Sequence, residues 1–135
     1  MSLAVGYDGG ESAGRALDTS IVLARDLGEK LFIVCGVAPA GGLGEEYESV
    51  EEAIVEDVGP HVMAAVRLAH DAGVEAEAIL VDADPVGALD TVVEEHSPRM
   101  IIVGYGSTDR IRRALFGAVS RRVVRGAEVP VLVVP

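Results

Sequence analysis

The chain has 135 residues, half of them apolar, and a formal net charge of −11. This length fits a single domain over 1–135, and the acidic charge argues against partners that are nucleic acids or anionic membranes. No apolar run reaches the roughly 18 residues of a membrane span, and the start lacks the basic region of a signal peptide, so we expect a cytoplasmic protein. The acidic composition, with Lys30 as the only lysine, fits a salt-adapted source and a high-GC genome equally well.

The first third of the chain reads as strand, helix and strand. Residues 2–7 are mostly apolar and Asp8-Gly9-Gly10 interrupts them, which predicts a buried strand followed by a loop. Ser12 is the predicted N-cap of a helix that Gly28 ends. Residues 31–37 are nearly all apolar, as expected for a strand covered on both faces in a parallel sheet.

The middle of the chain predicts a long helix and an edge strand. Apolar residues recur at helical spacing between Ser49 and Ala72, and Gly73 follows as the stop. Gly59-Pro60 lies inside this helix, where we expect a kink or a break. The segment "VEAEAILV" then alternates between charged and small residues, which is typical of a half-exposed strand at a sheet edge.

The last third repeats the alternation. Asp84-Pro85 predicts a helix start, Pro98 its end, and residues 100–103 a buried strand. A further helix is expected to stop at Gly126, before a final strand over Val131–Val134. Five strands that alternate with helices indicate an α/β fold with an open parallel sheet, helices on both faces and strand order 3-2-1-4-5.

That strand order predicts where a ligand binds. Ligands of open α/β sheets lie beyond the carboxyl ends of the strands, where the strand order reverses, here between strands one and four. The loops that begin at Asp8 and Gly104 should therefore converge. Asp8 could accept a hydrogen bond from a ribose hydroxyl or an adenine amine, or it is a turn residue, since Asp-Gly is common turn chemistry.

The loop after Gly104 combines glycines with basic residues. Gly104 and Gly106 allow a close backbone approach, and Gly117 precedes a helix whose amino end favours an anion. Six arginines fall within sixteen residues, and they suit either a phosphate or the surplus carboxylates of the chain: Arg110, Arg112, Arg113, Arg121, Arg122 and Arg125.

These features, together with the ending "VPVLVVP", resemble the universal stress protein family over essentially the whole chain. The resemblance implies a Rossmann-like fold of the adenine nucleotide alpha hydrolase-like type. Members that bind ATP carry G-x-x-G-x9-G-[S/T] in this loop. Gly104 and Gly117 match it with the nine-residue spacing kept, whereas Ser107 and Ala118 depart from it. The departures favour a nucleotide with fewer phosphates, or weak binding of ATP.

By the same resemblance, the expected ligand is ATP or AMP, and the participation of magnesium stays open. The residues expected to bind the nucleotide come from three strand exits and the glycine loop: Gly6, Tyr7, Asp8, Gly36, Val37, Val103, Gly104, Gly106, Ser107, Gly117, Ala118, Val119 and Ser120.

Two functions remain open from the sequence. One is a nucleotide-binding protein of the stress response. The other is a dimeric interaction module of the same fold that has lost nucleotide binding. An enzyme is not expected, because a Walker-type G-K-[S/T] is absent and His61, His70 and His96 lack metal-ligand spacing and read as surface residues. Val131–Val134 would be an exposed apolar edge in a monomer, so we expect a homodimer through this strand.

Overall fold

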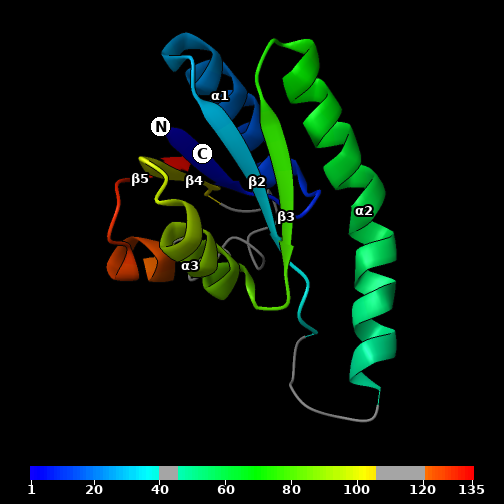
Figure 1. Cartoon of the computed structure of the whole chain (residues 1–135). Helices are drawn as coiled ribbons and strands as arrows, with labels where there is room; N and C mark the ends of the chain where they lie inside the picture. Colours follow the sequence, from blue (N-terminus) through cyan, green and yellow to red (C-terminus); the bar gives the residue numbers. More distant parts are fainter. Residues whose placement is uncertain (40–45, 106–120) are drawn as a thin grey trace.

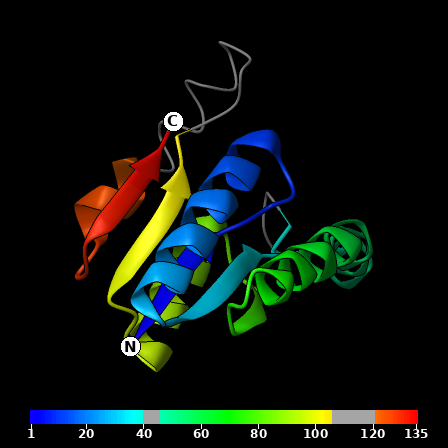
Figure 2. The ribbon, with the colours of Figure 1, turned by 90° about the horizontal axis from the view of Figure 1, so that it is seen from above.

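The fold is an open parallel α/β sheet, seen in a computed structural model that describes residues 1–39, 46–105 and 121–135. The strands lie in the order β3-β2-β1-β4-β5 and all neighbours pair in parallel, which confirms the predicted topology (Figures 1 and 2). The elements in chain order are β1 (Ser2–Gly6), α1 (Glu11–Leu27), β2 (Lys30–Gly36), α2 (Tyr47–Asp71), β3 (Ala76–Val81), α3 (Pro85–His96), β4 (Met100–Gly104) and β5 (Val131–Val134). Residues 121–126 are also helical.

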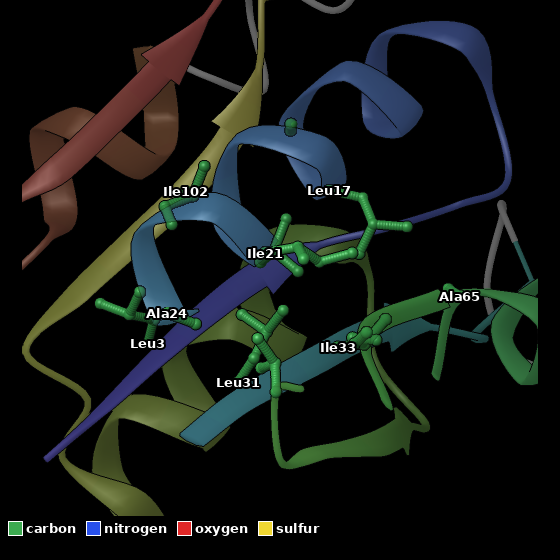
Figure 3. Packing of buried hydrophobic residues seen from close by; sticks show 12 residues of the cluster. Leu3, Leu17, Ile21, Ala24, Leu31, Ile33, Ala65 and Ile102 are labelled. Atoms are coloured by element: carbon green, nitrogen blue, oxygen red, sulfur yellow. The ribbon is translucent and has the colours of Figure 1, made fainter. Parts of the chain in front are cut away.

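Each face of the sheet is covered by helices. Because side chains alternate along a strand, Leu3 and Val5 face α1 and α2, whereas Ala4 faces α3. Figure 3 shows the first of these two cores, in which Leu17, Ile21 and Ala24 of α1 pack on strand residues. The second core gathers around α3 and includes Val123 of the last helix. With both faces covered, the central strands can be continuous apolar runs, as the sequence indicates.

The helix ends largely follow the predicted signals. Gly28 takes a left-handed φ of 66° after α1, and Gly73 takes a φ of 80° after α2. Asp84 caps α3, because its Oδ1 accepts a hydrogen bond of 2.8 Å from the backbone N–H of Gly87. Pro85 occupies the first turn of α3. None of the described helices combines the length and the apolar character that crossing a bilayer requires.

One local expectation was wrong and another was wrong in part. Ser12 does not cap α1: the helix begins at Glu11 with Gly10 as its N-cap, and Ser12 is buried inside the first turn. The break at Pro60 is also absent, since α2 runs through it without interruption. Val58 and Val62, on either side of the proline, are both buried. Their packing outweighs the loss of one helical hydrogen bond.

Three strands end in glycine at the same edge of the sheet. β1 stops at Gly6, β2 at Gly36 and β4 at Gly104. These are the carboxyl ends of the three central strands, which the parallel pairing aligns. The described fold therefore places the smallest residue at each strand exit that surrounds the predicted switch point.

Candidate functional site

The exits of β1 and β4 meet through the first turn of α1. β1 pairs directly with β4, with Val5 opposite Ile102. A Cβ atom on Gly104 would lie 2.3 Å from Oγ of Ser12 and 2.7 Å from its carbonyl oxygen. Only a residue without a side chain fits at this distance. The end of β4 is thus pressed against the helix that follows the Asp8 loop, so the residues at which the two predicted loops begin lie close together.

Asp8 forms the turn between β1 and α1. Its Oδ1 accepts a hydrogen bond of 2.8 Å from the backbone N–H of Gly10, and Gly9 between them has a φ of +83°. The turn interpretation of Asp8 is therefore confirmed, whereas its contact with a nucleotide stays a prediction. Oδ1 stabilises the turn, and the exposed carboxylate keeps Oδ2 as an acceptor for a ligand.

Tyr7 precedes this turn and anchors it to β2 through its backbone. Its backbone N–H donates to the carbonyl of Val34 at 2.8 Å, so the chain continues the β1–β2 ladder for one more residue. Burial, followed by the charges of Asp8 and Asp18, raises the pKa of the Tyr7 hydroxyl. Burial, and then Asp8, also raise the pKa of the Cys35 thiol, which keeps it in the neutral form.

The exit of β2 is closed toward β3. The backbone N–H groups of Val37 and Ala38 donate to the carbonyls of Val81 and Ala83, at 2.9 and 3.2 Å. A Cβ on Gly36 would lie 2.6 Å from the carbonyl oxygen of Ala83. The Val37 side chain is buried against α2. At this exit, then, Gly36 and Val37, which are expected to bind the nucleotide, present backbone and no exposed side chain.

Gly6 and Val103 lie deeper, under the site. The Val103 side chain is buried in the core on the α3 side. A Cβ on Gly6 would lie 3.6 Å from Val103 and from Leu89, which is ordinary contact. These two residues therefore shape the floor of the strand exits.

One of the basic residues of the last helix has a carboxylate partner. Arg122 contacts Oδ2 of Asp84 at 3.5 Å, while Oδ1 of the same carboxylate caps α3. Both side chains are more than half exposed. The sequence left carboxylate pairing and phosphate binding open for this arginine, and the described contact favours pairing, at the modest strength of a surface ion pair.

The remaining predicted site residues lie outside the described residues. This applies to Gly106, Ser107, Gly117, Ala118, Val119 and Ser120. Within the three described ranges, His, Cys, Asp and Glu side chains form no group of three or more that could hold a metal ion.

The sequence reading missed a neighbour of the Asp8 turn. His61 of α2 lies against Gly9, and a Cβ on that glycine would be 3.1 Å from Cγ of the imidazole. The interpretation of His61 as a surface residue describes its exposure correctly but overlooks this contact. Local periodicity contains no signal for it, because the contact joins segments that are fifty residues apart.

Comparison with known proteins relates the whole chain to one family. The profile of the Universal stress protein family matches residues 1–135. Universal stress protein MJ0531 of Methanocaldococcus jannaschii is 25% identical over 131 residues, which cover 94% of this chain and 77% of that protein. A universal stress protein from Archaeoglobus fulgidus in complex with dAMP has a similar fold, with a TM-score of 0.75, 22% identity, and coverage of 100% of this chain and 98% of that chain. The family protein from Arabidopsis thaliana with AMP bound gives a TM-score of 0.74 and 18% identity, covering 99% and 90%.

Proposed function

The chain belongs to the universal stress protein family, and from this premise we propose that it binds an adenine nucleotide at the carboxyl edge of its sheet, in a cytoplasmic stress-response role. The observation that carries the proposal is the close approach of Gly104 to the first turn of α1, since it brings the exits of β1 and β4 together at the switch point. Relatives of the same fold are in complex with dAMP and with AMP. The site offers a carboxylate for the nucleoside and a glycine-bordered strand exit for phosphate.

Asp8 is the residue that we assign to the nucleoside. Its Oδ1 is occupied by the Gly10 amide, which leaves Oδ2 to accept from a ribose hydroxyl or an adenine amine. The phosphate end falls to Gly104 and to the loop that follows it. Because Ser107 and Ala118 replace the glycine and the hydroxyl of the ATP-binding pattern, we favour AMP over ATP as the ligand.

Binding without turnover is part of the proposal. A titration by calorimetry with AMP and with ATP, followed by a measurement of released phosphate in the same samples, tests both parts. We expect saturable binding of AMP, weaker binding of ATP and no phosphate release. Absence of heat and of a thermal shift with either nucleotide would favour the interaction module instead.

One substitution of Asp8 separates its role in the turn from its role in binding the ligand. Asp8→Asn keeps an oxygen that accepts from the Gly10 amide but replaces the second oxygen by a donor, so the fold should stay unchanged. Loss of a charge-assisted hydrogen bond predicts roughly ten- to hundredfold weaker AMP binding for Asp8→Asn. Asp71→Ala, which removes a carboxylate at the end of α2, is the matched control and should bind as the wild type does. Equal affinity of Asp8→Asn and wild type contradicts the assignment.

The second candidate function, a dimeric module, is favoured by the position of β5. This strand forms one edge of the sheet, and its four residues are each only partly buried. Arg15 of α1 ties the segment down, because its Nε donates to the carbonyl of Pro135 at 3.1 Å. We infer a homodimer through Val131–Val134, which light scattering at micromolar concentration tests. A mass of 14.0 kDa for the whole sample would exclude it.

A further inference from the structure

A histidine from a distant helix closes over the Asp8 turn. His61 lies on α2, and a Cβ on Gly9 would meet Cγ, Cβ and Cδ2 of this side chain at 3.1, 3.2 and 3.4 Å. The atoms of His61 nearest this position of Gly9 are thus carbons of its ring and stem. In Figure 1 the loop that follows β1 reaches toward α2. The imidazole therefore covers the one position of the turn that has a positive φ.

Gly9 controls the direction of the Asp8 side chain. It separates Asp8 from Gly10, whose N–H holds Oδ1, and Gly10 in turn accepts the first backbone hydrogen bond of α1 from Gly14 at 2.9 Å. A rotation of the backbone at Gly9 would break one or both of these bonds. Whatever restrains Gly9 also restrains the carboxylate and the start of the helix.

The helix that carries His61 is itself fixed to the neighbouring strand exit. Val58 and Val62 are buried together with Cys35 and Val37 at the end of β2. One stretch of α2 thus contacts two strand exits, one through its valines and the other through its histidine. The buried valines therefore fix the backbone of α2 around His61, although the His61 side chain is itself exposed.

We propose that His61 is a positioning residue of the nucleotide site: its ring holds Gly9, and through Gly9 the Asp8 carboxylate, in the orientation that accepts the nucleoside. This inference rests on the proposed function for its role in binding, while the restraint on the turn itself does not depend on any ligand. Since the contact is made by carbon atoms, ring shape matters more than hydrogen bonding.

Three variants test the role of the ring. His61→Ala removes the contact, His61→Phe keeps a flat ring, and His70→Ala is the matched control, an exposed histidine of the same helix whose Nε2 lies 3.2 Å from the carbonyl oxygen of Ala76. We expect His61→Ala to weaken AMP binding roughly three- to tenfold, while His61→Phe and His70→Ala stay within about twofold of wild type. A double-mutant cycle with Asp8→Asn should be non-additive, because both changes act on one carboxylate.

The protein without ligand supplies an independent readout. In His61→Ala the Gly10 amide should exchange its hydrogen faster than in wild type and shift its resonance, and in His61→Phe and His70→Ala it should not. If wild type binds no AMP, the proposed function fails, and this amide still decides whether His61 restrains the turn. Unchanged Gly10 exchange in His61→Ala, or additive losses of affinity in the cycle, overturns the proposal.

Discussion

The edge formed by the amino ends of the strands and the edge formed by their carboxyl ends use polar residues in opposite ways. At the amino edge, charged side chains pair with each other: Oε1 of Glu29 lies 2.6 Å from Nη2 of Arg99, and Nζ of Lys30 lies 2.7 Å from Oε2 of Glu77. At the carboxyl edge, between β1 and β4, the Asp8 carboxylate bonds a backbone amide of its own turn, and glycines end the strands. The difference indicates that the first edge holds the fold together, whereas the second has free acceptors and a close backbone approach, which the proposed function assigns to a ligand.

The largest expected effect comes from a side chain at the glycine-bordered edge. Gly104→Ala places Cβ 2.3 Å from Oγ of Ser12, so α1 and β4 must separate. Overpacking of this kind costs about 1–3 kcal/mol of unfolding free energy, and AMP binding should be lost with it. Urea unfolding measures the first effect and calorimetry the second.

Gly14→Ala is the matched control for this substitution. Gly14 lies inside α1 with nothing within 4 Å of its Cβ position. An alanine there should raise the free energy of unfolding by about 0.5–1 kcal/mol, because it limits the unfolded chain. If Gly104→Ala is as stable as Gly14→Ala and binds AMP, the close approach of Gly104 to Ser12 limits neither stability nor nucleotide binding.

A smaller effect is expected at the amino edge, on stability alone. Arg99→Ala leaves the Glu29 carboxylate, which is only 7% exposed, without its cation. The loss should be about 2 kcal/mol, less than for a fully buried pair, because Arg99 is 40% exposed. AMP affinity should not change. Adding Glu29→Gln should recover part of the stability, and a variant that loses nucleotide binding here would contradict the division between the two edges.

The smallest expected effect is on the pH dependence of stability, and it arises at the carboxyl end of the outer strand β3. There Asp82 accepts a hydrogen bond from the Tyr47 hydroxyl of α2, which raises the pKa of Tyr47 to about 12. A hydrogen bond with Asp82 raises the pKa of Glu51, while bonds from Tyr47 and then Glu51 lower that of Asp82. At this exit, therefore, hydrogen-bonded side chains join α2 to the end of β3.

The opposite shifts predict an optimum in pH. The raised pKa of Glu51 gives stability that is lost as pH rises through it, and the lowered pKa of Asp82 gives stability that is lost as pH falls through it. The cluster should stabilise the fold most between the pH range in which Asp82 gains its proton and the range in which Glu51 loses its proton, near pH 4 to roughly 4.5. Glu51→Gln cannot ionise, so its stability relative to wild type should rise from about pH 4 to pH 7. Urea unfolding of both proteins at each pH measures this trend.

The sequence predicted the architecture because the signals for it are local. Period-two and apolar runs define the strands, Gly28 and Gly73 end helices, and Asp84-Pro85 begins one. The alternation of strands and helices, together with an edge-like third strand, then suffices to predict the strand order. The strand order in turn predicts that the exits of β1 and β4 meet.

The errors occurred where packing across the chain decides the outcome. Ser12 looks like a cap, but the carboxylate of Asp8 makes the turn first and the helix begins one residue earlier than Ser12. Pro60 looks like a break, but buried valines hold the helix through it. The contact of His61 with Gly9 depends on how α2 crosses the end of β1, which periodicity along α2 does not encode.

The ion pair of Lys30 has a practical consequence for chemical labelling. This residue carries the only lysine amine of the chain, and it lies on β2, beside edge strand β3 and three places from β5. An amine-reactive dye on this side chain would therefore report from β2 and β3 without touching β5 or the Asp8 turn. Acylation would also remove the charge that holds Glu77, so the first structural response to the label should be a loosened β3.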